Sequence, residues 1–509
     1  MRKSMARVAK SGIMNLMDAP LPPLIAALLD PQRYPEAVQR VDLVQTHISW
    51  VLLAAEFAYK IKKPVRLPFL DFSTLTLRQG CCQDELRLNR RFAPDLYLGV
   101  VALYNTLEDP QWSGTGLPIE YAVKMKRFEE ADRLDRVCDR GELQAAHLSD
   151  LADTLNAFHQ EAAIAPMDSC FGGAPEIIAP ARENFRDLLK LLPQAAVQHR
   201  LAALQYWTEV QFSQLAPLMV VRKRDGRVRE CHGDLHLANM VLIDQHVRLF
   251  DCLEFSEDLR WIDVASDLAF TYVDLLAHQQ PGLANWFVDE VLSRSGDYES
   301  VQVLRFYAVY RALVRAKVAA IRSLQSADDD HEALAYVALA ERLIALVPKH
   351  LVITHGLSGC GKTVASTTRL QSDPLASTVR LRSDVERKRL FGLAPTDASG
   401  STIDAGIYAA SAGAQTYARL RSLAEMLLRA GGTVIVDATF LKRADRDVFR
   451  ALAHQAGATF EILAPQATPD QLLQRIQARS AFGRDASEAT LDVLARQMRT
   501  VEPLQADER

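Results

Sequence analysis

At 509 residues the chain is too long for one hydrophobic core of ordinary size, so two or three domains are expected. Apolar residues make up 49% and charged residues 24%, a globular composition that excludes a largely disordered protein. The formal net charge of −4 excludes an overall basic surface of the kind that binds nucleic acid or anionic membranes.

The cysteines and the N-terminus bear on where the protein acts. The seven cysteines form no C-x-x-C pair and have no histidines at zinc-ligand spacing, so neither a disulfide framework nor a zinc site is expected. No continuous apolar stretch follows the basic N-terminus as a signal sequence requires, and apolar runs such as residues 48–59 are too short to span a bilayer. A cytoplasmic protein with no membrane contact is predicted.

The first two thirds of the chain mix strand and helix patterns. EFAYKI (residues 56–61) and EYAVKMKRF (residues 120–128) have the composition of strands. Further on, MVLI and VRLF are separated by Asp244-Gln245-His246, which predicts a β-hairpin between helical segments. This mixture predicts an α+β region.

One of these strands carries a candidate nucleotide-binding lysine. Phe57-Ala-Tyr-Lys60 is similar to the V-A-I-K strand of protein kinases, and alternation puts Ala58 and Lys60 on the face that would contact ATP. Lys62 lies on the same face and is the alternative, and Glu85 is a candidate ion-pair partner. No G-x-G-x-x-G precedes this strand, where the loop reads VQTHISW. Other backbone or hydroxyl groups must therefore cover the phosphates, or ATP binding here is weak.

A second motif supplies a candidate base and metal ligands. The segment from His232 to Asn239 has the H-x-D-x-x-x-x-N form of a kinase-like catalytic loop. Asp234 would face the substrate hydroxyl, while Asn239 and Asp251, which follows the predicted hairpin, would hold Mg²⁺. The alternative is a capped turn beside a buried histidine.

The HGDLHxxN form of this loop resembles the aminoglycoside and choline phosphotransferase group of kinase-like folds. FDCLEF, Asp263 and Asp267 in WIDVASDLAF, and a helix ending in Phe158-His159 add to the resemblance. It implies a protein-kinase-like domain that phosphorylates a hydroxyl group, and a degenerate domain with a regulatory role is the alternative.

The end of this region is marked by a break in the pattern. An acidic run, SADDD (residues 326–330), is followed by one more helix, and Pro348 then precedes the β-branched run LVITHG. We therefore expect an α+β protein-kinase-like domain over residues 1–346 and a second domain over residues 347–509.

Strand and helix patterns alternate in the second domain. Strands are predicted in LVITHG, STVRLRS, TVIVDATF and TFEIL, and helices over Lys362–Leu370, Tyr408–Ala430, Ala444–Ala456 and Thr468–Phe482. Such alternation is typical of right-handed crossovers and predicts an α/β fold with a parallel sheet.

The first predicted strand leads into a complete P-loop motif, G-x-x-x-x-G-K-[ST]. Its backbone N–H groups would surround the phosphates of ATP, Lys362 would reach the β- and γ-phosphates, and Thr363 would bind Mg²⁺. A chance glycine-rich turn is the alternative. The predicted cofactor-binding residues are Gly356, Ser358, Gly359, Cys360, Gly361, Lys362 and Thr363.

Other residues of this domain have candidate catalytic roles. Asp384 follows the second strand and would accept the proton of the acceptor hydroxyl, with a helix N-cap as the alternative. Asp437 ends the third strand and would hold Mg²⁺ through water. Arg475 and Arg479, one helical turn apart with Arg484 beyond, would close over the phosphates, unless they are solvated surface arginines.

GLSGCGKT, RSDVERKR and VDATFLKRADR together resemble the P-loop kinases that include polynucleotide 5′-kinase, gluconate kinase, zeta-type toxins and chloramphenicol phosphotransferase. The resemblance implies that Asp384 is the base, that Arg387 contacts substrate, and that Asp437 and Thr439 lie near substrate or metal. Small-molecule kinases and nucleic-acid 5′-kinases share these parts, so the acceptor does not follow from them.

The whole chain resembles a bacterial family with an aminoglycoside-phosphotransferase-like domain followed by an ATP-binding kinase domain. We therefore expect a phosphotransferase with two modules that use Mg-ATP and act on hydroxyl acceptors, more often small molecules than nucleic acid. The alternative is a polynucleotide or nucleotide 5′-kinase, or a toxin-like kinase, whose N-terminal domain is regulatory and inactive.

Overall fold

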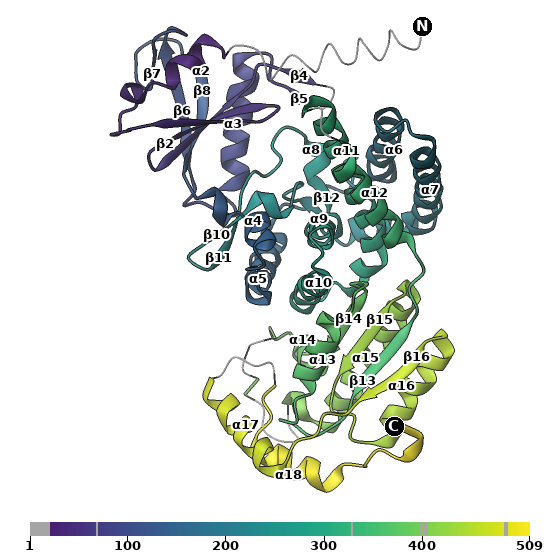
Figure 1. Cartoon of the computed structure of the whole chain (residues 1–509). Helices are drawn as coiled ribbons and strands as arrows, with labels where there is room; N and C mark the ends of the chain where they lie inside the picture. The colour runs from purple at the N-terminus through teal and green to yellow at the C-terminus, as the bar shows by residue number, and fades with distance from the viewer. Residues whose placement is uncertain are drawn as a thin grey trace. The chain divides into compact units, whose positions relative to one another are not determined.

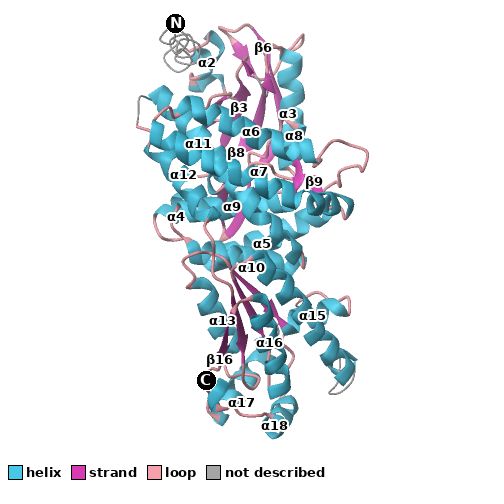
Figure 2. Cartoon of the chain, turned by 90° about the vertical axis from the view of Figure 1, so that its right-hand side faces the viewer, coloured by secondary structure: helices cyan, strands magenta, loops and turns pink. Residues whose placement is uncertain are grey.

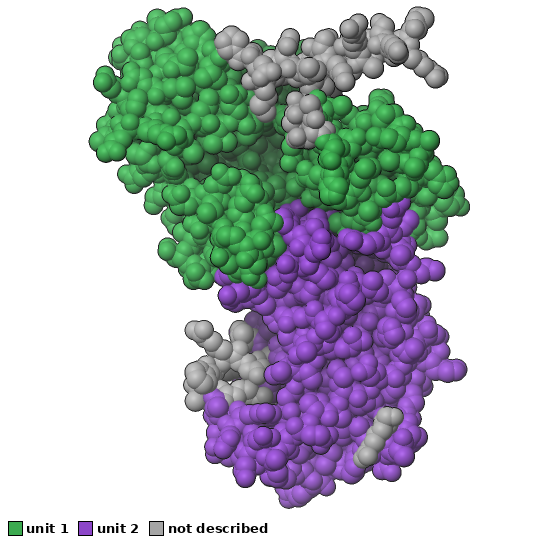
Figure 3. Space-filling model, viewed as in Figure 1, with its two compact units in different colours: residues 1–143, 157–271, 310–340 green, residues 144–156, 272–309, 341–509 purple. Residues whose placement is uncertain are grey.

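The computed structural model describes residues 21–67, 70–326, 329–395, 397, 399–400, 406–482 and 487–508. It divides into two compact units, shown in two colours in Figure 3. Unit 1 comprises residues 1–143, 157–271 and 310–340, and unit 2 comprises residues 144–156, 272–309 and 341–509. Within the described residues, no helix has the length and apolar character needed to cross a membrane.

Unit 1 begins with an antiparallel sheet that helix α3 (Leu75–Asn89) covers. The side chain of Thr74 caps α3 by accepting a hydrogen bond from the Leu77 N–H at 3.3 Å. The strands, in their spatial order, are β1 (Val41–Gln45), β2 (Ser49–Ala54), β3 (Phe57–Lys62), β8 (Glu120–Lys126), β6 (Tyr97–Asn105) and β7 (Pro110–Gln111).

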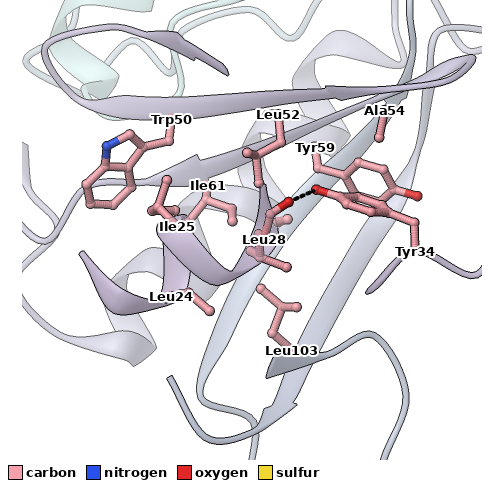
Figure 4. Packing of buried hydrophobic residues seen from close by; sticks show 11 residues of the cluster. Leu24, Ile25, Leu28, Tyr34, Trp50, Leu52, Ala54, Tyr59, Ile61 and Leu103 are labelled. Carbon is pink, nitrogen blue, oxygen red and sulfur yellow. Dashed lines mark hydrogen bonds between the residues drawn. The ribbon is translucent and has the colours of Figure 1, made fainter. Parts of the chain in front are cut away.

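The other face of this sheet contributes to an apolar core (Figure 4). Leu24, Ile25 and Leu28 of helix α2 (Pro23–Leu28) pack with apolar side chains of β2, β3 and β6. The Tyr34 hydroxyl donates a hydrogen bond of 2.9 Å to the Leu28 carbonyl, which ties the end of α2 to the segment that follows. The core therefore holds the sheet that carries Lys60.

The predicted strands and hairpin of this unit are confirmed. EFAYKI and EYAVKMKRF form β3 and β8, which pair with each other. MVLI and VRLF form β10 (Met240–Ile243) and β11 (His246–Leu249), with Ile243 paired to His246. Asp244 and Gln245 both have positive φ, as a two-residue turn of type I′ requires, so His246 belongs to the second strand rather than to the turn.

Most of the remaining chain of unit 1 is helical (Figure 2). Helices α5 (Ala145–Glu161), α9 (Val264–Ala277), α11 (Val301–Ser326) and α12 (His331–Ile344) each run from one compact unit into the other. The elements wholly within unit 1 include η1 (Pro31–Arg33), β4 (Arg66–Leu67), β5 (Leu70–Asp71), η2 (Glu130–Asp132), α4 (Leu134–Asp139), α6 (Ala174–Leu191), α7 (Ala195–Arg224), β9 (Val228–Glu230), η3 (Leu237–Asn239), α8 (Glu257–Arg260) and β12 (Trp261–Asp263).

Unit 2 is built on a parallel sheet, as the alternating pattern predicts (Figure 1). Its strands in spatial order are β14 (Thr378–Arg382), β15 (Thr433–Asp437), β13 (His350–Thr354) and β16 (Thr459–Leu463). The middle strands are nearly continuous runs of buried residues, which is typical of a sheet covered on both faces.

Four helices of unit 2 agree with the predicted ones to within a few residues, namely α13 (Lys362–Gln371), α15 (Ala410–Ala430), α16 (Arg443–Ala456) and α17 (Pro469–Phe482). The structure adds α14 (Ser383–Leu390) and α18 (Leu491–Thr500), which are not among the predicted helices, and the short η5 (Gly406–Tyr408) and η6 (Ala506–Glu508).

One helix of unit 2 comes from a different part of the sequence. Helix α10 (Pro281–Ser295) packs against α13 and β14, although helices α11 and α12 lie between it and residue 347 in the sequence. The division of the chain into domains 1–346 and 347–509 stays a prediction, because compact packing and sequence organisation divide the chain by different criteria.

A pair of leucines tests the core of unit 1. Leu103 in β6 is fully buried, whereas Leu107, four residues later, is 46% exposed. We expect Leu103→Ala to lower the free energy of unfolding by about 2–5 kcal/mol, since it removes buried methyl groups and leaves a cavity. The control Leu107→Ala should change it by no more than about 0.5 kcal/mol. Thermal unfolding of both variants measures the difference, and equal melting temperatures would contradict this description of the core.

Candidate functional site

The P-loop connects β13 to α13 through a sharp turn that depends on glycine. Gly359 and Gly361 have φ of 85° and 99°, values that a residue with a side chain rarely adopts. At Gly359 a Cβ would also lie 3.2 Å from the Leu472 carbonyl oxygen. Gly361 is the N-cap of α13 and provides no capping side chain, so the first N–H groups of the helix are available to an anion.

The turn borders a cavity of about 1020 Å³. Lys362 donates hydrogen bonds to the carbonyl oxygens of Gly356 at 3.0 Å and Leu357 at 2.8 Å, so its ammonium group lies against the turn. The predicted residues that line the cavity are Ser358, Gly359, Gly361, Lys362, Thr363, Asp384, Arg387, Asp437, Thr439 and Arg475.

Gly356 and Cys360 differ from the other predicted P-loop residues because they are not part of this lining. The Cys360 side chain is buried in an apolar cluster with Leu472 and Ile476 of α17 and Leu494 of α18. Cys360 thus attaches α17 and α18 to the P-loop, and any contact with a phosphate would be through its backbone N–H.

Asp384 is the second residue of α14 and lines the cavity. The N-cap of α14 is Arg382, and no side chain caps it, so the structure gives no support to the helix-cap alternative for Asp384. Its carboxylate instead lies 3.5 Å from the guanidinium of Arg387, one turn along the same helix. Asp384 and Arg387 therefore present a carboxylate and a cation side by side.

Asp437 at the end of β15 lies against two hydroxyl groups. The Ser366 hydroxyl is 3.1 Å from Oδ2 and 3.0 Å from the Thr363 carbonyl oxygen, and either can accept its proton. The Thr354 hydroxyl is 3.4 Å from Oδ1 and donates to the Ala438 carbonyl at 2.6 Å. Thr363 and Asp437 both line the cavity, and an alcohol and a carboxylate are oxygen ligands of the kind that Mg²⁺ prefers. The donor set therefore fits a bound Mg²⁺ with its waters.

The predicted arginine segment reaches the P-loop through Arg475, which donates to the Gly359 carbonyl at 3.2 Å. Arg479 belongs to α17, but its side chain lies outside the described part of the structure, as does the whole of Arg484. The roles of these three arginines stay predictions.

Some residues of this site carry no sequence motif. The side-chain amide of Gln497 in α18 accepts a hydrogen bond of 2.7 Å from the Ser358 N–H, and Gln497 and Arg496 line the cavity. Arg382 and Lys442 also line it, and they belong to the quoted motifs RSDVERKR and VDATFLKRADR, which assign them no role. No element is predicted over the residues of α18, and nothing in them indicates contact with a loop about 140 residues earlier.

In unit 1, Glu85 of α3 lies between the two candidate lysines. Its Oε1 is 2.8 Å from Lys60 Nζ and its Oε2 is 2.5 Å from Lys62 Nζ. Burial alone would raise the pKa of Glu85, but the two ammonium groups lower it to about 2. Glu85 is thus an ionised partner of both lysines, not of Lys60 alone.

The second partners distinguish the two lysines. Lys60 also pairs with Asp251, whose side chain is 42% exposed, whereas Lys62 pairs with the buried carboxylate of Glu254. Lys60 therefore belongs to the open side of the cluster and Lys62 to its closed side. This geometry favours Lys60 as the phosphate contact.

The catalytic-loop residues lie beside Asp251. The side-chain amide of Asn239 donates to the Asp234 carboxylate at 2.9 Å, and the backbone carbonyl of Asn239 accepts from the Phe250 N–H at 3.0 Å. Asp251 has φ of 61°, and its N–H donates to the Tyr97 hydroxyl. A strained backbone at this point is consistent with a functional role, and the amide and carboxylate oxygens of Asn239 and Asp251 fit a hard cation.

The charge of Asp234 is stabilised by a neighbouring histidine. Its Oδ2 lies 3.4 Å from His236 Nε2. Burial raises the pKa of Asp234, but His236, His232 and Arg315 together outweigh this effect and hold the pKa well below its usual range. Asp234 is therefore ionised at neutral pH, so its carboxylate can accept the proton that an acceptor hydroxyl releases.

Two further acids are buried in this region, and one of them contacts the loop. Asp267 is fully buried and accepts hydrogen bonds from the N–H groups of His232 at 3.2 Å and Gly233 at 3.0 Å, and His159 lies 3.4 Å away. Asp263 pairs with Arg222 through two contacts of 2.7 and 2.8 Å and accepts from the Ala265 N–H. Asp267 thus holds the backbone of the loop, whereas Asp263 joins α7 to the start of α9.

The strand pair β1–β2 lies where protein kinases have their glycine-rich loop. Here the turn is closed by Thr46, whose hydroxyl accepts from the Ser49 N–H at 2.9 Å. Because the Thr46 hydroxyl is hydrogen-bonded inside the turn, it does not replace the missing glycine-rich loop as a contact for the phosphates of ATP.

Comparison with known proteins agrees with this description of unit 2. Residues 351–504 match the family model described as AAA domain. This region is a P-loop domain. The chain is also 29% identical over 459 residues to an uncharacterized protein of Mycobacterium tuberculosis (strain ATCC 25618 / H37Rv), with 89% of each chain covered. A protein of Mycobacterium bovis gives the same values. These matches extend well beyond the P-loop domain.

Solved structures resemble the preceding region. A choline kinase from Cryptosporidium parvum covers 63% of this chain and 94% of its own at 11% identity and a TM-score of 0.40. Choline kinase LicA from Streptococcus pneumoniae covers 60% and 94% at 15% identity and a TM-score of 0.36. The protein-kinase-like fold of unit 1 is seen independently in its sheet, in the pairing of α3 with β3 through Glu85 and Lys60, and in the hairpin that leads to Asp251.

Replacing each lysine by methionine separates the two roles. Lys62→Met leaves the buried Glu254 without a cation and should lower the free energy of unfolding by about 3–5 kcal/mol. Lys60→Met keeps the Glu85–Lys62 pair, so it should unfold at a higher temperature than Lys62→Met yet lose Mg-ATP binding in unit 1. Calorimetry of both variants, in a Lys362→Ala background, measures unfolding and binding. If Lys62→Met lost Mg-ATP binding and Lys60→Met were the less stable variant, Lys62 would be the lysine that contacts the phosphates.

Proposed function

We propose that this protein is an ATP-dependent phosphotransferase with two kinase modules, each of which transfers the γ-phosphate of Mg-ATP to a hydroxyl group of a small molecule. The observation that carries the proposal is the P-loop cavity, where Lys362, Asp384 and Asp437 line one space with the open N-terminus of α13. A phosphate-binding turn, a candidate metal ligand and a candidate base are what phosphoryl transfer requires.

In the P-loop module, the backbone N–H groups of the turn and Lys362 bind the phosphates. Thr363 and Asp437 would hold Mg²⁺, which supplies charge neutralisation between the phosphates. Asp384 accepts the proton of the acceptor hydroxyl as its oxygen forms a bond to the γ-phosphorus, and the bond between that phosphorus and the bridging oxygen breaks to release ADP. Arg475 and Arg387 offset negative charge around the transferred group.

In the kinase-like module, Lys60 would contact the phosphates while Glu85 orients its ammonium group. Asn239 and Asp251 would hold Mg²⁺, and Asp234 would take the proton of a second hydroxyl acceptor. The hydrogen bond between Asn239 and Asp234 ties the metal-binding group to the base, which supports a module arranged for transfer rather than for binding alone.

The side chains that line the P-loop cavity carry both signs of charge. Five are acidic, namely Asp384, Asp437, Asp445, Glu488 and Asp492, and six are basic, namely Lys362, Arg382, Arg387, Lys442, Arg475 and Arg496. A lining of nearly balanced charge lacks the excess of basic groups with which proteins neutralise the phosphates of RNA, which supports a small acceptor. The turn at Thr46, which replaces a glycine-rich loop, is the feature that favours the second candidate, a nucleotide or polynucleotide 5′-kinase with an inactive kinase-like module. Retention of RNA that falls steeply with salt would support that candidate.

Two substitutions test the P-loop module. Lys362→Ala should abolish phosphate transfer there and weaken nucleotide binding, since it removes the cation at the phosphates. Asp384→Asn should lower transfer by about 10²–10⁴-fold with nucleotide affinity close to wild type, because it removes a base and no phosphate contact. Transfer of labelled γ-phosphate to sugars, aminoglycosides and nucleosides is the measurement, in an Asp251→Ala background.

The control for Asp384→Asn is Asp470→Asn in the first turn of α17, an exposed acid outside the cavity lining, which should transfer phosphate like wild type. Equal rates for the Asp384 and Asp470 variants would rule out Asp384 as the base.

The kinase-like module is tested in the full chain carrying Lys362→Ala. This protein should still bind Mg-ATP, and adding Asp251→Ala should remove that binding because it deletes a metal ligand. Asp234→Asn should instead keep the binding and stop any remaining transfer. Titration calorimetry follows the binding, and failure of the Lys362→Ala protein to bind Mg-ATP would identify the module as inactive.

A further inference from the structure

Helix α10 presents a buried polar face to the P-loop domain, next to the edge strand β14 (Figure 1). Asn285 and Asp289 are four residues apart, so both lie on this face, and each is 1% exposed. Asn285 donates to the Leu370 carbonyl at 2.9 Å and accepts from the Thr378 N–H at 3.2 Å. Asp289 accepts from the Arg380 N–H at 3.2 Å.

These contacts complete the edge of the parallel sheet. The N–H groups of alternate residues in an edge strand have no partner strand, and a buried N–H without a partner is costly. In β14 the side chains of α10 accept from Thr378 and Arg380, the alternate residues whose N–H groups point away from β15. Helix α10 therefore takes the place of a further strand beside β14.

From Asp289 a line of polar contacts leads to the candidate metal ligand. Asp289 Oδ2 lies 2.7 Å from Arg380 Nη2, in a pair whose side chains are at most 2% exposed. The other arm of the Arg380 guanidinium contacts the hydroxyls of Thr367 at 2.6 Å and Ser366 at 3.4 Å. The Ser366 hydroxyl lies 3.1 Å from Asp437 Oδ2 and 3.0 Å from the Thr363 carbonyl oxygen, and either can accept its one proton. The contacts that lead from Asp289 through Arg380 and Ser366 to Asp437 are buried, so water cannot readily replace a lost partner there, whereas the contact of Arg380 with Thr367 is partly buried.

The residues after α10 support the helix of the candidate base. The Tyr298 hydroxyl, in the 3₁₀ turn η4 (Tyr298–Ser300), donates to Glu386 at 3.1 Å. Glu386 is fully buried and also pairs with Arg389 and Arg419. It lies two residues after Asp384 in α14, so residues 281–300 contact the helix that carries the candidate base and are linked to Asp437 through Arg380 and Ser366.

We propose that Asp289 and Ser366 are positioning residues of the P-loop site, which hold Asp437 in the orientation that binds Mg²⁺. The proposal rests on the proposed function of that site. Asp289 fixes the guanidinium of Arg380, Arg380 limits the rotation of the Ser366 side chain, and Ser366 orients the carboxylate. The site is then incomplete without α10, a helix that lies outside the region matched to the AAA domain family.

Two variants of the full chain test this, each in an Asp251→Ala background so that Mg²⁺ binding reports on the P-loop site. Asp289→Asn removes the charge that holds Arg380, and Ser366→Ala removes only the hydroxyl beside Asp437. Outer-shell partners of a metal typically contribute 10–100-fold to metal affinity. Titration calorimetry of Mg²⁺ into the ADP-loaded protein should therefore show about a tenfold or greater loss for both variants. ADP affinity in EDTA should stay close to that of the background protein.

The matched control is Asp153→Asn. Asp153 is an exposed residue of α5 that pairs with Arg294 of α10, so removing its charge should leave Mg²⁺ affinity unchanged. Should Asp289→Asn fail to fold, Ser366→Ala alone decides the matter. Variants that melt earlier but bind Mg²⁺ like the background protein would overturn the proposal, as would an equal loss in Asp153→Asn. Absence of Mg²⁺ and ADP binding in the background protein itself would overturn the proposed function, and this inference with it.

Discussion

Glu85 lies at 0% exposure between the ammonium groups of Lys60 and Lys62, and Asp289 lies at 1% exposure against Arg380. Removing an ion from water costs several kcal/mol, so a buried charge persists only where an opposite charge is held against it. Both candidate sites are built on this constraint. Each contains a fully buried ion pair whose orientation depends on the packing around it, and a more exposed acid that the pair helps to hold.

The constraint also explains how one helix face can act at a distance. Asp289 cannot change its position without leaving Arg380 unpaired, and Arg380 cannot turn without losing the hydroxyls of Ser366 and Thr367. The Asp289–Arg380 pair is stiff because both side chains are buried and water cannot serve as an alternative partner. The pair of Asp153 and Arg294 has no such effect, since the Asp153 side chain is 69% exposed and solvent replaces it at little cost.

Local signals were sufficient for much of the fold. The P-loop turn, the parallel strands and the hairpin at Asp244 and Gln245 follow from backbone requirements that a short stretch of sequence expresses, such as positive φ or a continuous apolar run. The kinase-like loop was equally visible, because Asp234 and Asn239 must lie a fixed number of residues apart to contact each other. The roles assigned to these residues stay predictions.

Contacts between distant segments were not accessible in the same way. Glu85 was expected to pair with one lysine and pairs with two, because alternation in β3 places Lys60 and Lys62 on the same face. Gln497 meets Ser358 across 139 residues, and Asp289 meets Arg380 across 91. In a helix, an Asn and an Asp spaced by four residues are usually solvated. Only the position of α10 against an edge strand turns them into hydrogen-bond acceptors for a sheet.

The edge strand β14 also explains why no single residue divides the chain into its two folded units. A parallel sheet of four strands leaves the outer N–H groups of β14 to be satisfied, and the described residues from 347 onward contribute no strand beside it. The acceptors come from residues 285 and 289, which precede the polar break at residues 326–330. A boundary inferred from turn residues and composition marks where a pattern changes, whereas the limits of a folded unit depend on where its last hydrogen bonds are completed. In this chain the two divisions differ over residues 144–156, 272–309 and 341–346, and α10, which lies in this set, contacts β14 and α13.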